Sequence, residues 1–369
     1  MKKIIIAMCL TSLTTAGYGE QSDVAKFDPN MIVKNAIVDD SGVKWIDGQY
    51  LPLEGKAFSD VDFFYDRLPK NVTTNVNPGV RNIKHHSAGL QFRFKTDSGK
   101  LWIKWTPRNR ELAMDHMPST GVSGIDIYAK GDDGVWRYVK TGRITNPDGG
   151  VCELGWKPGT PCLINLPLYN GIKTFTLGIE ANATVEALEP RTNGINRPVV
   201  FYGTSITQGG CCSRPGLSFV NIVGRQLDVP VVNLGFSGSG KMELEMSEHL
   251  TNIDAACYVL DCLWNMDNPT VEKNYEPFIR NLRSKCPNVP IVMAEQCDVF
   301  SPESNYKDKV MRNLYEKLLA EGWKDLVYLP KTKMYLDSEG TVDGCHPNDR
   351  GMMSLAVAFG EAVKIALDL

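Results

Sequence analysis

Near the middle of the chain runs the segment Val199-Val200-Phe201-Tyr202-Gly203-Thr204-Ser205-Ile206-Thr207-Gln208-Gly209. Its first four residues are apolar and β-branched or aromatic, and they end at a glycine. Such a run, bounded by turn residues, is typical of a buried strand in a parallel sheet. In open α/β sheets, ligands bind where the chain leaves the carboxyl ends of the strands. The segment therefore predicts a strand that presents Ser205 as a nucleophile, although serine is also common in ordinary turns and at helix N-caps.

A second group of polar residues lies near the end of the chain, in Val342-Asp343-Gly344-Cys345-His346-Pro347-Asn348-Asp349. A serine hydroxyl needs a base in hydrogen-bond reach, and the base needs a carboxylate that orients it. We expect His346 to be that base and Asp343 its carboxylate. The alternative is a turn-forming aspartate beside a surface histidine, but the chain has only five histidines. Cys345 as the nucleophile is disfavoured because Ser205 is better placed.

Apolar segments and helical patterns alternate after a linker at residues 190–198. Strands are predicted near 199–203, 229–236, 257–264, 289–295 and 326–330, and helices near 217–227, 242–251, 270–285, 305–321 and 349–367. Alternation of this kind implies a five-stranded parallel sheet with helices on both faces and right-handed crossovers. The predicted α/β domain covers residues 195–369.

Residues 25–190 are predicted to form an all-β domain, a sandwich of the jelly-roll kind. Alternating residues at 90–95 and 101–106 around the turn 97–99 indicate a hairpin with one buried face. A second hairpin is expected around residues 131–134, and a further strand at 173–179. His85, His86 and His116 are interpreted as structural or surface residues rather than metal ligands. Tryptophans 102, 105 and 136 are core residues or, alternatively, a sugar-stacking platform.

Four sequence blocks resemble those of the SGNH (GDSL-type) hydrolases over roughly residues 195–369. They are Gly203-x-Ser205, Gly238 after the second predicted strand, Asn265 after the third, and Asp343-x-x-His346. The sequence has Thr204 where aspartate is usual and Met266 where aspartate is common. In the other half, Gly124-Ile125-Asp126-Ile127-Tyr128 resembles the Gly-x-Asp-Leu-Tyr motif of the β domain that precedes some bacterial SGNH esterases.

The resemblance implies an oxyanion hole, which is a set of donors for the charged oxygen of a tetrahedral intermediate. The donors would be the backbone N–H groups of Ser205 and Gly238 and the side-chain amide of Asn265. Taken without the resemblance, the glycines near 238 could form a flexible turn and Asn265 could be a helix cap. No P-loop pattern is present.

Two further side chains are weaker candidates for substrate binding. Arg214 follows the nucleophile and could hold a polar substrate or pair with an acidic neighbour. Glu295, at the end of the fourth predicted strand, is a candidate for the pocket wall.

Composition limits the classes of function. The chain has 369 residues, of which 43% are hydrophobic and 22% charged, and a net charge of −3. These values suit a soluble protein of about two domains, and no basic run favours nucleic acid or an anionic membrane as a partner. Residues 1–19 resemble a secretory signal too short to span a bilayer. We therefore expect export to the periplasm or beyond, with lipoprotein anchoring through Cys9 disfavoured.

Loss of Cys9 with the signal would leave nine of the ten cysteines, an odd number. At least one thiol is then expected to be free or to pair between chains. Cys152 and Cys162 could close a short bridge, whereas Cys257 and Cys262 are interpreted as small apolar core residues.

Together these features predict a secreted serine esterase that removes a small acyl group, expected to be O-acetyl, from a carbohydrate. The alternatives are a lipase or thioesterase of the same fold, or a glycan-binding protein without catalysis. No metal or organic cofactor and no membrane span is expected. The glycan, the acetyl position and the oligomeric state stay open.

Overall fold

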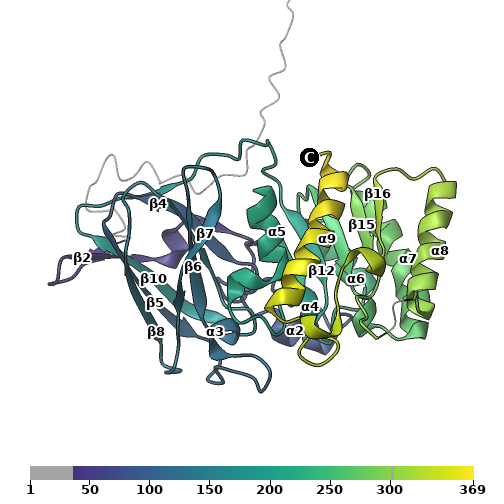
Figure 1. Ribbon diagram of the computed structural model, residues 1–369, viewed down its shortest axis with the longest axis horizontal. Helices are drawn as coiled ribbons and strands as arrows, with labels where there is room; N and C mark the ends of the chain where they lie inside the picture. Colours follow the sequence, from purple (N-terminus) through teal and green to yellow (C-terminus); the bar gives the residue numbers. More distant parts are fainter. Residues whose placement is uncertain (1–35, 301–302) are drawn as a thin grey trace, which may run out of the picture.

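The computed structural model describes residues 36–300 and 303–369 (Figure 1). The predicted signal peptide and the first residues of the predicted β domain lie outside this range. Two parts lie side by side: a β part that contains the strands β1 to β11, and an α/β part that ends at the C-terminus.

The β part consists of two antiparallel sheets. One has the strand order β1-β2-β10-β5-β8, and the other β11-β4-β9-β6-β7 with β3 paired to β4. The strands are β1 Ala36–Val38, β2 Val43–Asp47, β3 Leu53–Glu54, β4 Gln91–Thr96, β5 Lys100–Pro107, β6 Ile125–Lys130, β7 Trp136–Gly142, β8 Gly150–Gly155, β9 Pro161–Asn165, β10 Ile172–Glu180 and β11 Val185–Ala187. The predicted antiparallel architecture is confirmed, whereas the jelly-roll topology stays a prediction.

The two sheets enclose one apolar core. Phe92 of β4 packs on Phe175 of β10, with 4.3 Å between the ring centres. Trp105 of β5 is 1% exposed in the same core, so this tryptophan is a core residue. The predicted hairpin at residues 131–134 is confirmed, because β6 pairs with β7 around that turn.

The hairpin predicted at residues 90–106 is wrong. β4 pairs with β9, β11 and β3, whereas β5 pairs with β10 and β8 in the other sheet. The turn after β4 therefore carries the chain from one sheet to the other. Alternation shows which face of a strand is buried, but it does not show which strand is its partner. Here the inward residues of β4 and β5 meet across the core.

The α/β part is built on a parallel sheet of five strands, as predicted, and the structure shows their order in the sheet to be β13-β12-β14-β15-β16. Its strands are β12 Val199–Gly203, β13 Val231–Gly235, β14 Cys257–Asp261, β15 Ile291–Ala294 and β16 Leu326–Leu329. Its helices are α4 Ser205–Gln208, α5 Phe219–Leu227, α6 Leu244–Leu250, α7 Asn268–Lys285, α8 Tyr306–Ala320 and α9 Asp349–Leu367, and its 3-10 helices are η3 Pro215–Leu217, η4 Leu263–Asn265, η5 Lys331–Lys333 and η6 Ser338–Gly340.

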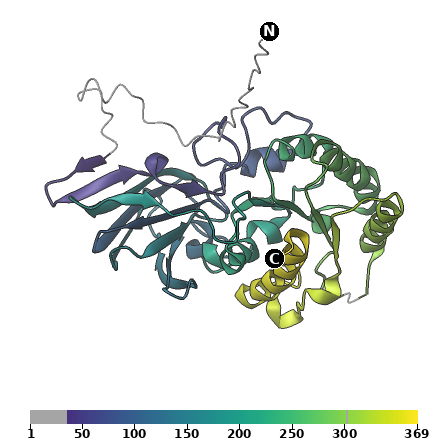
Figure 2. The ribbon, with the colours of Figure 1, turned by 90° about the horizontal axis from the view of Figure 1, so that it is seen from above.

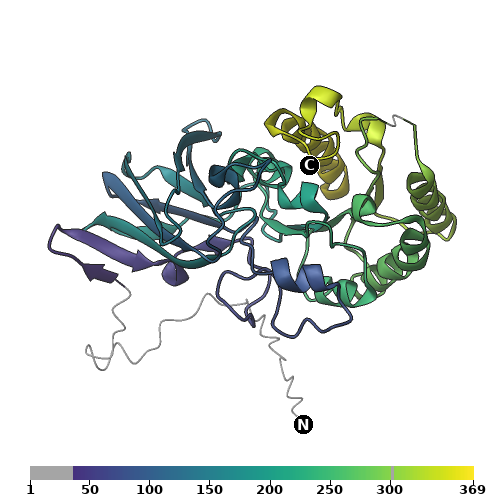
Figure 3. The same ribbon diagram turned by 90° about the horizontal axis from the view of Figure 1, so that it is seen from below.

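Helices cover both faces of this sheet. Helices α5 and α9 lie on one face, where Phe219 stacks on Phe359 at 4.5 Å between ring centres. Helices α6, α7 and α8 lie on the other, where Tyr202 of β12 stacks on Phe278 of α7. The views from above and below show the two helix layers on opposite sides of the strands (Figures 2 and 3).

A segment from the N-terminal half packs on the α/β part as well as on the β sandwich. It runs between β3 and β4 and contains α2 Pro78–Ile83. Leu68, Val76 and Val80 are buried in the same cluster as residues of β12, α6 and α7. The short helices η2 Gly48–Tyr50 and α3 Ser119–Val122 complete the N-terminal half. The two halves therefore share an apolar core.

Among the described residues, the thiols of all nine cysteines are free. The bridge suggested between Cys152 and Cys162 is not formed: the two residues lie on β8 and β9, in different sheets. Cys257 and Cys262 are fully buried, as predicted for apolar core residues. No helix in the described part of the chain is both long and apolar enough to cross a membrane.

Candidate active site

Ser205 lies where β12 ends, at the first position of α4. Thr204 caps this helix, because its side chain and that of Thr207 form a reciprocal capping box. A threonine in place of the usual aspartate therefore still accepts hydrogen bonds from the N–H groups of the first turn. A Cβ on Gly203 would lie 2.0 Å from the Thr207 Oγ1 atom, so the strand-to-helix turn has no space for a larger residue.

The structure brings Ser205, His346 and Asp343 into one hydrogen-bonded chain. The Ser205 Oγ atom lies 2.8 Å from His346 Nε2. On the other side of the imidazole, Nδ1 lies 2.7 Å from Asp343 Oδ2. The turn that holds the histidine is closed by Asp343 Oδ1, which accepts hydrogen bonds from the backbone N–H groups of Cys345 and His346. Ser205 is 7% exposed.

The carboxyl group of Asp343 stays ionised in this arrangement. Partial burial raises its pKa, but hydrogen bonds from the backbone and side chain of His346 outweigh that effect and lower the pKa to about 2. A carboxylate charged at all ordinary pH values favours the imidazole tautomer that carries its proton on Nδ1. That tautomer leaves Nε2 free to accept the proton of the serine hydroxyl.

The glycine-rich loop after β13 lies next to this chain of residues. Gly238 has φ +65°, a left-handed conformation that glycine adopts without strain. The N–H groups of Ser239 and Gly240 both donate to the Phe236 carbonyl. Within residues 36–300 and 303–369, the N–H groups of Ser205 and Gly238 have no hydrogen-bond partner. Two free donors of this kind suit an oxyanion.

Asn265 is held against the same loop. Its Nδ2 atom lies 3.1 Å from the Phe236 carbonyl oxygen and 3.3 Å from that of Gly240. The asparagine therefore connects η4, after β14, to the loop that carries Gly238. In this geometry the amide group donates to the loop backbone.

A chain of polar contacts supports this loop from behind. The Ser237 N–H donates to Gln208 Oε1, and Gln208 Nε2 donates to His86 Nδ1 at 2.9 Å. Burial, reinforced by the nearby Arg67, lowers the pKa of His86 to about 3, so its imidazole is neutral and can accept this bond. The structural interpretation of His86 agrees with these contacts.

Arg214 pairs with an acidic neighbour, one of the two roles considered above. Its Nη1 atom lies 2.7 Å from Oδ2 of Asp126, which is fully buried. The same oxygen accepts the Gly216 N–H, and Oδ1 accepts the amide of Asn165. The aspartate of the Gly-x-Asp-Leu-Tyr-like motif therefore fixes the loop after the candidate nucleophile onto the β part.

Glu295 does not lie free in a pocket wall. It is 1% exposed, and its Oε1 atom accepts hydrogen bonds from Arg312, Ser304 and the Tyr328 hydroxyl. Its Oε2 atom accepts the Lys331 N–H. Both oxygens thus serve to join β15 to α8 and β16, and the structure shows Glu295 as a structural carboxylate.

Three residues near the site were not recognised as site residues from the sequence. The Tyr169 hydroxyl donates to the Ser205 carbonyl at 3.1 Å. The ring of His116 lies 6.1 Å from that of His346, centre to centre. Phe300, 76% exposed, packs on the Asp343–His346 turn, since a Cβ on Gly344 would lie 2.2 Å from its ring. No spacing rule connects such distant positions, so the sequence carried no usable signal for these three residues.

Among the residues that the structure describes, one cluster has the ligand types for a metal ion, and it consists of Asp62, Asp66 and His85. Its groups have partners within the protein, because Lys84 pairs with Asp62 at 2.7 Å and His85 with Asp66 at 2.9 Å. These pairs hold together the segment before β4. They explain His85 as a structural residue.

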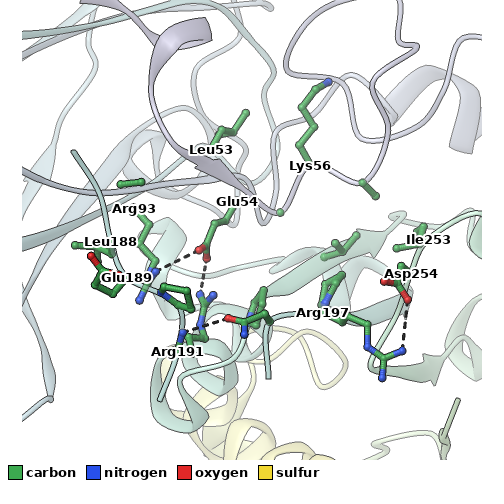
Figure 4. A pocket seen from close by; sticks show the side chains of 18 of the residues that line it. Leu53, Glu54, Lys56, Arg93, Leu188, Glu189, Arg191, Arg197, Ile253 and Asp254 are labelled. Atoms are coloured by element: carbon green, nitrogen blue, oxygen red, sulfur yellow. Dashed lines mark hydrogen bonds and ion pairs between the residues drawn. The ribbon is translucent and has the colours of Figure 1, made fainter. Parts of the chain in front are cut away.

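A cavity of about 730 Å³ lies at the opposite edge of the parallel sheet from Ser205. Residues just before β12 and β13 line it, together with residues near β3 of the β part (Figure 4). Five of its charged side chains pair with one another: Arg191 and Arg93 face Glu54, and Arg197 faces Asp254. The cavity therefore lies away from the candidate chemistry.

A parallel sheet that carries a Ser-His-Asp group at its carboxyl edge is compatible with an acylhydrolase. Residues 196–364 match the GDSL-like lipase/acylhydrolase family, and residues 43–185 match the N-terminal domain of SGNH-hydrolase-type esterases. The chain belongs to the SGNH (GDSL-type) hydrolases that carry this N-terminal domain.

Solved structures with the same arrangement include a protein from Bacteroides ovatus assigned as a GDSL-like lipase. It is 28% identical, covers 88% of this chain and 98% of its own, and has a TM-score of 0.77. The salicylyl-acyltransferase SsfX3 of a tetracycline pathway is 16% identical (89% and 98%, TM-score 0.70). A family two carbohydrate esterase from Cellvibrio japonicus is 12% identical (88% and 98%, TM-score 0.58). No curated protein sequence matches the chain significantly.

Proposed function

We propose that this protein is a secreted serine esterase that removes acetyl groups from a carbohydrate. The observation that carries the proposal is the chain from Ser205 Oγ to His346 Nε2, at 2.8 Å, and from His346 Nδ1 to Asp343 Oδ2, at 2.7 Å. A serine held at hydrogen-bond distance from an oriented imidazole is the arrangement required of an activated nucleophile.

The reaction follows from this geometry. His346 accepts the Ser205 proton as the oxygen attacks the ester carbonyl, and the Ser205 and Gly238 N–H groups donate to the oxyanion. The Asn265 amide would join them by exchanging one of its backbone carbonyl partners. His346 then gives its proton to the leaving alcohol, and water releases the acyl group from Ser205 by the same steps in reverse. Each oxyanion donor contributes roughly 10²–10³-fold to the rate.

A small acyl group and a sugar are supported by the surroundings of the site. The loops that follow β13 and β14 are short, at residues 236–243 and 262–267, and neither forms a long apolar lid. The exposed ring of Phe300 beside the catalytic turn offers a surface of the kind on which sugar rings stack. A family two carbohydrate esterase shares the fold at low sequence identity, and this supports a carbohydrate ester as the substrate.

The test is acetate release from acetylated polysaccharides, with nitrophenyl acetate as the general ester. Ser205→Ala and His346→Ala should lower kcat on both by roughly 10⁴–10⁶-fold and leave the circular dichroism spectrum unchanged. The matched control is Ser41→Ala, which changes an exposed serine of the β part that is distant from Ser205 in the sequence. More than a tenth of wild-type turnover in either site variant would contradict the assignment.

The lipase alternative predicts a different dependence on acyl length. A buried methylene contributes about 0.8 kcal/mol, so an enzyme for long chains should gain in kcat/KM with each carbon added. We expect acetyl esters to be cleaved faster than butyryl esters, and octanoyl esters to be barely cleaved. A maximum of kcat/KM at eight carbons or more in a nitrophenyl ester series would establish the lipase instead.

A further inference from the structure

We infer that the β part supplies a substrate-binding residue to the esterase site, namely His116, which binds the alcohol half of the ester. The inference rests on the proposed function. It assigns a task to the N-terminal domain beyond packing, because the tip of one of its loops borders the candidate base.

The loop that carries His116 contains a hydrogen-bonded turn. Met114 and Met117 exchange two backbone hydrogen bonds, at 2.9 and 3.1 Å, so Asp115 and His116 form the tip of a tight turn. The Met117 side chain is 2% exposed and belongs to the core cluster of the α/β part, together with Ile206 of α4. The turn is thus anchored on the domain that carries Ser205.

The base of the same loop is also fixed. Asn170, which is 1% exposed, accepts the Asn109 N–H at 2.9 Å and donates to the Asn109 carbonyl at 3.0 Å. It also donates to the Ser123 hydroxyl at 3.0 Å. A loop held at its base and next to its tip presents the residue at the tip in one place, as a binding residue requires.

The tip places His116 beside the base. The ring centres of His116 and His346 are 6.1 Å apart, with 60° between the ring planes. The side chain of His116 is exposed and makes no hydrogen bond or ion pair within the described part of the chain. Its imidazole therefore has a donor and an acceptor available for a ligand.

The position of His116 beside His346 indicates which half of the ester it would contact. The base returns its proton to the leaving oxygen, so that oxygen must lie against His346 Nε2. The carbonyl oxygen points instead to the N–H groups of Ser205 and Gly238. We therefore assign His116, whose ring flanks that of His346, to the alcohol half of the ester. For a sugar alcohol, the His116 nitrogens would meet a neighbouring hydroxyl group.

The experiment compares two acetyl esters that differ only in the alcohol. For the wild type, His116→Ala, His116→Asn and Glu111→Ala, kcat/KM is measured on an acetylated xylo-oligosaccharide and on nitrophenyl acetate. We expect His116→Ala to lower the ratio of the two values about tenfold, as loss of one hydrogen bond does. His116→Asn, which keeps a donor and an acceptor, should recover part of the ratio. Glu111→Ala, an exposed residue of the same loop, should keep the wild-type ratio.

The outcomes separate the two proposals. An equal loss on both esters in His116→Ala would show that the histidine acts through His346 and not on the alcohol, which overturns the inference. Wild-type values of kcat/KM on both esters in His116→Ala would overturn it as well. If the wild type cleaves nitrophenyl acetate but no acetylated sugar, the carbohydrate function itself is wrong, and the inference fails with it.

Discussion

At the scale of single residues, the candidate site depends on hydrogen bonds between residues that are close together in the sequence. Asp343 is three residues from His346, and one of its oxygens closes the turn while the other orients the imidazole. The same carboxylate therefore has a structural task and a chemical one. Its lowered pKa, about 2, reflects both sets of bonds.

The stability of the protein should depend on pH through the ionisation of Asp343. The pKa of Asp343 in the folded protein lies below its ordinary value of 3.8, so the ionised group stabilises the fold above about pH 4. This contribution is lost as the pH falls from about 4 to about 2. The difference in the free energy of unfolding between wild type and Asp343→Asn should therefore shrink over that range in urea titrations. Asp132→Asn, an exposed carboxylate in the β6–β7 turn, is the control. A difference that does not vary with pH would contradict the assignment of these bonds.

At the scale of secondary-structure elements, the Gly-x-Asp-Leu-Tyr-like motif of β6 connects the β part to the loop after α4. Asp126 receives hydrogen bonds from Asn165, Arg214 and Gly216, and the Tyr128 ring packs beneath the Arg225 guanidinium at 4.1 Å. Thr120 also donates to the Ser213 carbonyl at 2.6 Å, and the Ser213 N–H donates to Asp349 at the start of α9. The motif thus lies at the interface of the two parts.

Removal of the Asp126 charge should destabilise the protein strongly. Asp126→Asn leaves Arg214, largely buried, without its anion, and loss of one partner of a buried pair costs about 3–5 kcal/mol in the free energy of unfolding. Asp133→Asn removes a partner of the exposed pair with Arg137 in the hairpin that begins with the same strand, and it should change stability little. Denaturant unfolding of the two variants measures the contrast. Similar losses in the free energy of unfolding for the two variants would show that the buried pair stabilises the protein no more than the exposed pair does.

At the scale of the whole molecule, the two parts are joined by more than one interface residue. Arg67, which is 2% exposed, donates to the carbonyls of Ile83 and His86 in its own segment and to those of Asn233 and Gly235 at the end of β13. A Cβ on Gly89 would lie 2.4 Å from the Asn233 side chain, so the segment before β4 lies directly on the parallel sheet.

A shared core predicts cooperative unfolding. We expect a single thermal transition in calorimetry, with coincident midpoints in far-ultraviolet circular dichroism and tryptophan fluorescence. Arg67→Met removes the donor to four carbonyls, of which those of Asn233 and Gly235 are buried, and it should lower the midpoint without splitting the transition. Two separate transitions in the wild type would show that the β and α/β parts fold independently.

The sequence by itself determined the succession of strands and helices along the chain in the α/β part and the β-sheet character of the N-terminal half. It also determined which residues were expected to meet at the site. This was possible because apolar periodicity is local, and because parallel strands bring their carboxyl ends to one edge, where Ser205, Gly238 and Asn265 follow three of them. Only the tertiary structure decided the partners of β4 and β5, the free thiols of Cys152 and Cys162, the buried network of Glu295 and the pairing of Arg214 with Asp126. The physical reason is that alternation and charge identify a buried face or a polar group, whereas a partner distant in sequence is chosen by packing. His116 beside His346 is the same case: 230 positions separate the two residues, and the fold of two domains brings their rings together.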